Sequence, residues 1–248
     1  MLTRTLSYFV AALLLLTFPP ACSKKGNGGQ TGQACELARI SIQRTGTQTI
    51  TLTYDEQGRI QAAETTDPGY PTTEKTYTYP GNMVIMNTSV SGKPGSADSV
   101  TLDSSGRVQT DHFTSLSGGS SYLLIYTFAG DQVQKLIEQD SSGTVISSET
   151  FTWTGGNLVS VTTAIGGTSF TNTYSYNSEP AAPGDYWSEY QLLNYPVPFI
   201  RTANRVTGIS NINGTTTFRY AMDGTGKISK ITASGANPET DSYQWSCR

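Results

Sequence analysis

The sequence has few of the residues that build metal centres, nucleic-acid surfaces and helical folds. One His and 3 Cys in 248 residues are too few soft ligands for a zinc or iron site, so we expect no metal and no cofactor. Charged residues make up 14% of the chain, the net charge is −3, and the absence of a basic cluster argues against nucleic acid as a partner. The chain is instead rich in Thr, Tyr and Gly, residues of strands and turns, which excludes an all-helical fold.

The sequence also lacks an apolar run long enough to cross a bilayer as a helix. The run at residues 9–18 has about ten residues where a membrane-spanning helix needs about 20, and this length suits the apolar centre of a secretory signal. We therefore predict a signal peptide over residues 1–21.

Cys22 follows that segment and precedes a polar stretch. The arrangement resembles a bacterial lipoprotein signal, in which the Cys is lipidated and becomes the mature N-terminus; the alternative is cleavage without lipidation. The resemblance implies a lipid anchor in the outer membrane. Lys24 and Lys25 follow the Cys in place of the acidic signature associated with surface display in related bacteria, which favours the periplasmic side over the cell surface. Residues 22–34 then form a lipidated flexible tether, because residues 23–33 contain no apolar side chain.

The two remaining cysteines, Cys35 and Cys247, lie at opposite ends of the expected folded region. An exported protein folds where disulfides are permitted, so these residues are candidates for a bridge that would tie the first strand to the last. The alternative is a pair of unrelated buried thiols.

From residue 38 onward the chain repeats a strand followed by a turn. Ile50, Leu52 and Tyr54 alternate with Thr residues, which is typical of a half-buried strand. An Asp-x-x-Gly turn follows, in which the Asp side chain accepts hydrogen bonds from backbone amides and the Gly takes the left-handed conformation that closes a hairpin. The predicted structural turn residues in the four copies are Asp55, Gly58, Asp103, Gly106, Asp140, Gly143, Asp223 and Gly226.

Large apolar residues recur at intervals of 23 to 26 residues, at Tyr54, Tyr79, Leu102, Phe128, Trp153 and Tyr176. A period near 24 residues corresponds to two strands of about nine residues and two turns. We therefore predict an all-β fold, an antiparallel meander of about 14–16 strands made of repeated hairpins, in a single domain over residues 35–248.

These copies resemble the Tyr-Asp (YD) repeats of Rhs-type and teneurin-like proteins, with a close match at residues 54–60 and a fair one at residues 102–108. The signal, length and copy number are more similar to a family of secreted Bacteroidetes lipoproteins of unknown function with a porin-like β-barrel fold. That resemblance covers about residues 38–248. It implies a closed or flattened barrel and an envelope location, and it implies no catalytic residues.

Residues 178–204 interrupt the repeat. Asp185 is a predicted N-cap for a short helix near residues 185–195, which Pro196 and Pro198 end. An insertion of this kind usually covers an open end or edge of a sheet. Two interpretations remain, a hydrophobic plug that completes the core and a lid that binds a ligand, for which the candidate residues are Trp187, Tyr190, Tyr195 and Phe199.

The sequence offers little for catalysis. His112 is the single His, and no glycine-flanked nucleophile elbow surrounds any Ser, so His112 is interpreted as a surface or rim residue. The repeated Asp residues stand where turns need them and lack the further carboxylates of a calcium loop. We predict that the protein is not an enzyme.

The direction of the apolar face decides the function. Glu149, Thr163 and Asn172 interrupt that face, the chain ends Trp-Ser-Cys-Arg without a terminal aromatic residue, and a lipid anchor would be redundant on a spanning barrel. We therefore expect a soluble barrel with its apolar side inward.

Closing so many strands leaves an interior wider than side chains easily fill. The first hypothesis is a non-enzymatic envelope lipoprotein that binds an apolar ligand, a glycan or a peptide inside or at the mouth of the barrel. The second is a structural or interaction module with a packed core and an envelope protein as its partner. The third is a porin-like channel in the outer membrane.

Overall fold

The computed structural model describes residues 35–44 and 46–247. The predicted signal peptide, the lipidation site Cys22 and the tether lie outside the described residues. The chain divides into two units: residues 36–246 form a β-barrel, and Cys35 and Cys247 are the described residues of the other unit. These two cysteines form a disulfide across a sequence separation of 212, which confirms the predicted pairing.

Within the described ranges the chain forms sixteen β-strands and one α-helix. The first eight strands are β1 (Cys35–Gln43), β2 (Thr47–Tyr54), β3 (Ile60–Thr66), β4 (Thr73–Thr78), β5 (Met83–Val90), β6 (Lys93–Leu102), β7 (Val108–Ser115) and β8 (Tyr122–Ala129). The remaining elements are β9 (Gln132–Asp140), β10 (Val145–Thr154), β11 (Asn157–Ile165), β12 (Thr168–Pro180), α1 (Tyr186–Asn194), β13 (Asn204–Asn211), β14 (Gly214–Met222), β15 (Ile228–Gly235) and β16 (Glu239–Cys247).

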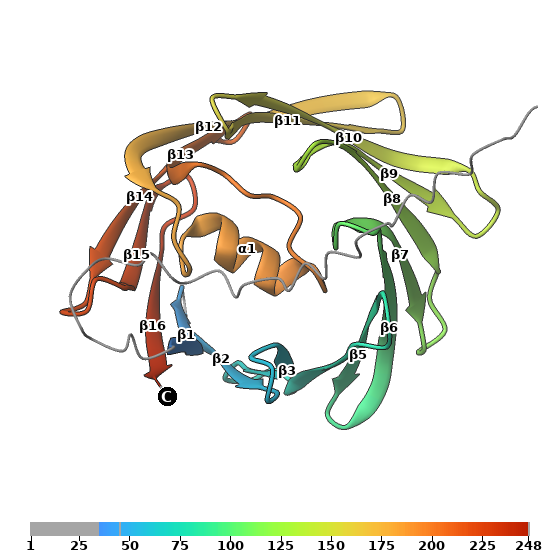
Figure 1. Ribbon diagram of the computed structural model, residues 1–248, viewed down its shortest axis with the longest axis horizontal. Coiled ribbons are helices and arrows are strands. Elements are labelled where there is room, and N and C mark those ends of the chain that lie inside the picture. Colours follow the sequence, from blue (N-terminus) through green and yellow to red (C-terminus); the bar gives the residue numbers. More distant parts are fainter. Residues whose placement is uncertain (1–34, 45, 248) are drawn as a thin grey trace, which may run out of the picture. The chain divides into compact units, whose positions relative to one another are not determined.

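The strands close into a barrel in which each pairs with its neighbours in sequence and β1 lies beside β16. The pairs of consecutive strands are antiparallel, including β12 with β13, which the segment containing α1 connects. Figure 1 shows the ring of strands with α1 inside it. The all-β prediction with one short helix is therefore confirmed; the barrel is closed rather than flattened, and the strand number is the upper end of the expected range.

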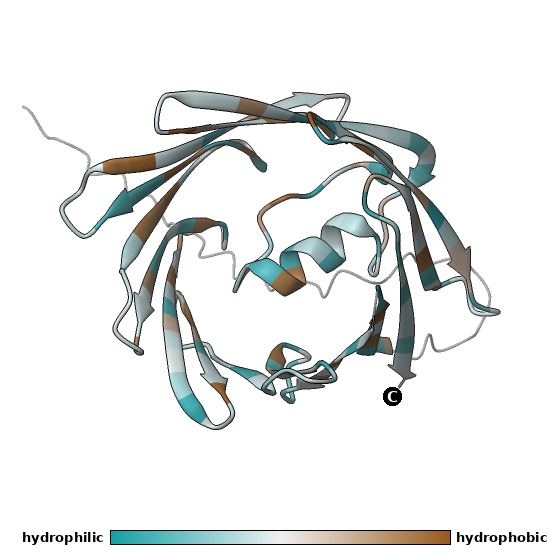
Figure 2. Cartoon of the chain, turned by 180° about the vertical axis from the view of Figure 1, so that it is seen from behind, coloured by the Kyte–Doolittle hydropathy of each residue, from teal (hydrophilic) through white to brown (hydrophobic). Residues whose placement is uncertain are grey.

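The apolar side of each strand faces the interior of the ring. On β2, Ile50 and Leu52 are 3% and 5% exposed, whereas Thr53 between the strand centre and the turn is exposed. Tyr126 of β8 and Phe151 of β10 contact Phe199 of the segment inside the ring, which identifies their side of the sheet as the inner one. Figure 2 shows hydrophobic and hydrophilic residues interspersed along the strands, as alternation between two faces requires.

Three large apolar residues near the ends of strands are exposed. Ile165, Phe170 and Met222 are 49%, 41% and 41% exposed. Ile165 and Met222 are the last residues of β11 and β14, and Phe170 lies near the start of β12. The β11–β12 hairpin and the end of β14 therefore project beyond the packed interior, where an inward orientation no longer produces burial.

The Asp-x-x-Gly turns join strands through side-chain acceptors. Asp55 Oδ1 accepts hydrogen bonds from the amides of Gln57 and Arg59 at 3.0 and 2.9 Å, and Gly58 has φ +75°. A side chain at that φ would be strained, which explains the Gly. In the other three copies, the amides two and four residues after the Asp likewise donate to its side chain, at Asp103, Asp140 and Asp223. The corresponding glycines with positive φ are Gly106, Gly143 and Gly226.

Candidate ligand-binding site

α1 lies inside the barrel and begins where the sequence indicated. The Asp185 side chain accepts a hydrogen bond from the Ser188 amide at 3.0 Å and caps the helix N-terminus. Asn194 is the last helical residue. Pro196, two residues later, has no backbone N–H and cannot donate a helical hydrogen bond. Across the described part of the chain, no helix is both long and apolar enough to cross a membrane.

Aromatic residues of the segment 186–200, hereafter the plug, contact the barrel wall on several sides. Phe199 packs edge to face on Tyr126 of β8, with ring centroids 5.0 Å apart. Trp187 lies 4.9 Å from Tyr174 of β12. Edge and tilted ring pairs of this kind add to the free energy of burial, so the plug is an integral part of the barrel core.

Gln191 holds the plug in its folded-back shape. Its Oε1 accepts hydrogen bonds from the Phe199 and Ile200 amides at 2.6 and 2.5 Å, and its Nε2 donates to the Ile200 carbonyl at 2.8 Å. The side chain is 2% exposed, so it satisfies buried backbone groups that would otherwise lack partners. A Gln in a helix carries no sequence signal for this role, and sequence reasoning missed it.

The four candidate ligand-binding residues occupy different environments. Trp187 and Phe199 are each 4% exposed and belong to the core, where Trp187 Nε1 donates to the Tyr176 hydroxyl at 3.2 Å. Tyr195 is half-buried against Phe199, with ring centroids 4.7 Å apart. Tyr190 is 36% exposed and lines a cavity. The structure therefore brings one of the four to an accessible site.

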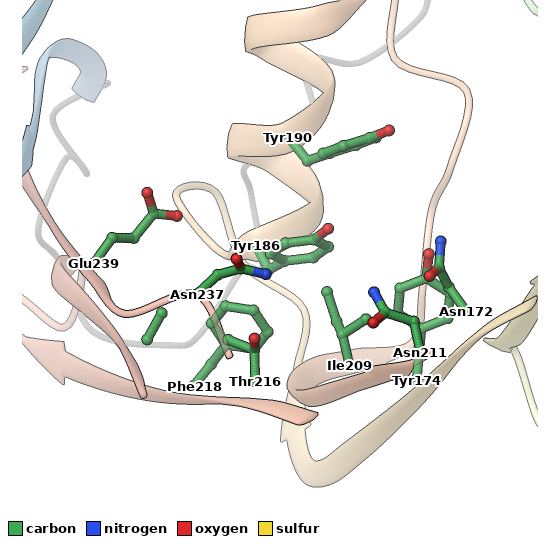
Figure 3. A pocket seen from close by; sticks show the side chains of 11 residues that line it. Asn172, Tyr174, Tyr186, Tyr190, Ile209, Asn211, Thr216, Phe218, Asn237 and Glu239 are labelled. Atoms are coloured by element: carbon green, nitrogen blue, oxygen red, sulfur yellow. The ribbon is translucent and has the colours of Figure 1, made fainter. Parts of the chain in front are cut away.

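The cavity has a volume of about 290 Å³ and lies between α1 and the wall formed by β12 to β16. Its aromatic lining consists of Tyr174, Tyr186, Tyr190 and Phe218 (Figure 3). Tyr186 and Tyr190 are stacked with centroids 5.8 Å apart, and Tyr186 lies 4.9 Å from Phe218. These rings form the apolar surface of the site.

Polar side chains from separate elements complete the lining. They are Asn172 of β12, Asn211 of β13, Thr216 of β14, Asn237 of the β15–β16 loop and Glu239 of β16 (Figure 3). Glu239 forms an ion pair with Arg44, Nε to Oε2 2.5 Å, so its charge is already compensated. No pattern in the sequence relates these positions, because the pairing of β12 to β16 and the placement of α1 inside the ring bring them together.

The tyrosines of the cavity are neutral over the physiological range. Burial is the main cause that raises the pKa of Tyr174, Tyr186 and Tyr190 above the ordinary phenol value. Their hydroxyls therefore remain both donors and acceptors of hydrogen bonds.

Two carboxyl groups lie in the interior across the ring from the cavity, on β6 and β7 (Figure 1). Asp98 and Asp111 are 6% and 3% exposed. Burial raises the pKa of Asp98 to about 6, and burial together with the Asp98 charge raises the pKa of Asp111 to about 7. Lys75 of β4 opposes the shift of Asp98, and its Nζ donates to the Leu193 carbonyl of the plug at 2.8 Å.

A second pair joins α1 to β16. Glu189 accepts a hydrogen bond from the Tyr243 hydroxyl, and burial raises the Glu189 pKa to about 7. Burial and then the Glu189 charge raise the pKa of Asp241 to about 8. Like charges in a low-dielectric interior disfavour joint ionisation. These carboxyls and the Asp98–Asp111 pair are not in the cavity lining, so they stand apart from the candidate site.

Other candidate sites are poor. A cavity of about 20 Å³ beside Arg107 and Phe199 has room for little more than one water molecule. His112 is exposed on β7, facing away from the interior side that holds Asp111. In residues 35–44 and 46–247, no group of three or more His, Cys, Asp or Glu side chains has an arrangement that could hold a metal ion.

The sequence matches no known protein family and no curated protein. The fold is similar to that of a porin-like protein from Bacteroides uniformis, with a TM-score of 0.63, 15% identity, and coverage of 85% of this chain and 96% of that chain. It is also similar to a porin-like protein from Bacteroides vulgatus, with a TM-score of 0.57, 12% identity, and coverage of 84% and 97%. At these identities the likeness establishes a shared fold, and this chain has the barrel fold of those porin-like proteins.

Proposed function

We propose that this protein is a non-enzymatic binding protein of the cell envelope that holds a small polar ligand in the cavity between α1 and β12 to β16. The observation that carries the proposal is the cavity itself, where the plug stops short of filling the barrel. Its volume of about 290 Å³ is near the low end of the ligand-pocket range of roughly 300–1,000 Å³. An aromatic surface with a few convergent polar groups is the usual lining of such pockets.

The envelope location rests on the signal at residues 1–21 and on Cys22 as a lipid anchor, with the periplasmic side of the outer membrane favoured. The names of the two Bacteroides proteins with this fold agree with an envelope role. The porin alternative is less well supported. A transmembrane barrel needs an outward apolar band, whereas the apolar residues of this barrel form its interior core and the plug occupies that interior.

Of the expected ligand classes, the lining favours a polar one over an apolar cargo. An apolar cargo would need an apolar interior space, and here Trp187 and Phe199 of the plug occupy the apolar interior. The remaining cavity is bordered by amide, hydroxyl and carboxylate groups as well as by aromatic rings. A glycan or a short peptide end fits this mixture.

The proposal is tested by native mass spectrometry of residues 23–248, exported to a periplasm and purified without detergent. We expect an adduct that is released on denaturation. Tyr190→Ala should lower the adduct fraction, and Tyr70→Ala, at a position that is 71% exposed and outside the cavity, should not. A clean unbound mass, with no binding to any added probe, would contradict the proposal.

A structural or interaction module is the second candidate, and the packing of the plug favours it. Trp187 and Phe199 complete the core as a structural element does. Under this alternative the outer wall binds another envelope protein, and crosslinking in intact cells should recover that partner with equal yield from the wild type and from Tyr190→Ala.

A further inference from the structure

We infer that the cavity binds a neutral carbohydrate, one sugar ring at the end of a glycan; this inference rests on the proposed binding function. The first argument is charge. Among the residues that line the cavity, Glu239 is the one with an ionised side chain, and Arg44 already pairs with it at 2.5 Å. A charged ligand would enter a partly buried site without a compensating partner, which is unfavourable.

The second argument is the stacked aromatic surface. Tyr186 and Tyr190 lie nearly parallel, with an interplanar angle of 20°, and Tyr190 is the more exposed of the two. A sugar ring presents an apolar C–H face together with a polar edge, and aromatic rings bury such a face without requiring hydrogen bonds from it. Tyr190 thus offers an accessible surface against which a pyranose lies flat.

The third argument is the set of amides that converge on the cavity from different elements. Asn172, Asn211 and Asn237 surround the space beside Tyr186 in Figure 3. Each amide supplies both donors and an acceptor, and a sugar hydroxyl is likewise a donor and an acceptor. Asn211 Oδ1 already accepts from the Asn213 amide, which leaves its NH2 group for a ligand, and within the described residues the Asn237 side chain has no hydrogen-bond partner.

The fourth argument is size and access. A cavity of about 290 Å³ at the low end of the usual range suits one ring rather than an extended oligomer. Asn237 and Tyr190 are exposed, so the cavity opens to solvent beside them. A terminal ring can enter while the rest of the glycan remains outside.

The test uses saturation-transfer NMR and calorimetric titration of the mature chain, residues 23–248. The probes are neutral methyl glucopyranoside, methyl galactopyranoside and N-acetylglucosamine, with glucuronate and glucosamine as charged counterparts. We expect at least one neutral probe to bind and the charged probes to bind more weakly. Tyr190→Ala and Asn237→Ala should each weaken binding by about fivefold, since a ring contact or a hydrogen bond contributes about 1 kcal/mol.

Matched controls lie outside the cavity. Tyr70→Ala and Asn87→Ala remove an exposed Tyr and an exposed Asn on other elements, and both should bind as the wild type does. Asn237 lies in an exposed loop, so Asn237→Ala tests the site even if Tyr190→Ala disturbs folding.

The outcomes separate this inference from the proposed function. Preferential binding of a charged probe, or neutral binding that neither cavity variant weakens, would overturn the carbohydrate assignment. If no sugar binds while native mass spectrometry still finds an adduct that depends on Tyr190, the ligand class is wrong and the binding function stands. If no sugar binds and no adduct is found, both fail.

Discussion

The guanidinium carbon of Arg59 lies 4.1 Å from the centroid of the Tyr79 ring, over its face. The same Arg59 pairs with Asp55 at 2.7 Å, and the Tyr79 hydroxyl donates to the Ile60 carbonyl at 2.6 Å. One turn is thereby linked to the aromatic residue of the next repeat by a cation–π contact and a hydrogen bond. The cation–π contact recurs with Arg107 over Phe128 at 5.3 Å and Lys227 over Trp245 at 6.0 Å.

The hydrogen bond of Tyr79 also recurs. Aromatic side chains near the C-terminal ends of β2, β4, β10, β12, β14 and β16 donate to a backbone carbonyl 14 to 20 residues earlier, forming what we call the aromatic girdle. Its donors are Tyr54, Tyr79, Trp153, Tyr176, Tyr220 and Trp245. A register shift immediately precedes Tyr54, Trp153 and Tyr176, and a bulge of this kind re-aims a side chain. Tyr54, Tyr79, Trp153 and Tyr176 of the girdle are among the residues that recur with the period near 24 residues.

Tyr79→Phe should remove the girdle hydrogen bond and keep the ring. We expect the free energy of unfolding to fall by about 1 kcal/mol, because the Ile60 carbonyl loses a partner while the cation–π contact remains. Urea denaturation with an unchanged slope measures this loss. Tyr70→Phe, at an exposed position outside the girdle, is the control, and equal effects of the two substitutions would contradict the role of the girdle.

Gln191→Leu should loosen the plug. The substitution leaves the buried amides of Phe199 and Ile200 without their acceptor, and we expect a loss of about 3 kcal/mol from two unsatisfied groups. Limited proteolysis should cleave the variant within residues 186–200 before it cleaves the strands. Gln244→Leu, at an exposed position on β16, should change neither readout. If Gln244→Leu lowered the stability and led to cleavage within residues 186–200 as Gln191→Leu does, the effect would not be specific to the plug.

The protein should be less stable at pH 8 than at pH 5. The pKa values of Asp98, Asp111, Glu189 and Asp241 are raised to about 6, 7, 7 and 8, so the folded state binds protons more tightly than the unfolded chain. The stability that these four carboxyl groups contribute is fully present below their unfolded-state pKa of about 4. It is lost as the pH rises through their folded-state pKa values. Thermal unfolding followed by circular dichroism from pH 4 to 9 measures the effect.

Asp111→Asn tests the source of this pH dependence. The amide cannot ionise, so the variant should lose less stability than the wild type between about pH 5 and pH 8. Glu64→Gln, at an exposed position on β3, should leave the profile as it is. A wild-type profile that is flat over this interval, or that rises with pH, would contradict the prediction.

The disulfide should stabilise the barrel without determining its fold. On the chain-entropy model, a bridge across a separation of 212 contributes about 5 kcal/mol. The double variant Cys35→Ser with Cys247→Ser should keep the far-ultraviolet spectrum of the barrel and unfold at a lower urea concentration. Reductant should lower the urea midpoint of the wild type and leave that of the double variant unchanged. Equal urea midpoints of the two proteins without reductant would contradict a stabilising role.

Local rules were sufficient for much of the fold. The Asp55–Gly58 turn, the alternation of Ile50 and Leu52 with Thr residues, and the Asp185 cap all depend on residues within a few positions of one another. Their chemistry can therefore be recognised in sequence. Repetition of that chemistry predicted a meander of hairpins, and the meander is the barrel that the structure shows.

The candidate site depends on long-range packing and could not be predicted in the same way. Asn172 and Asn237 are 65 positions apart and line one cavity with Tyr190 because β12 to β16 pair side by side and α1 packs inside the ring. The sequence predicts four aromatic residues as ligand-binding, but packing decides which of them a ligand can reach. Trp187 and Phe199 belong to the core, while Tyr190 stays accessible. By itself, the sequence determined the strands, the turns and the helix, because those follow from short-range hydrogen bonding and backbone preference. Tertiary structure decided which polar side chains share the cavity, because that depends on long-range packing.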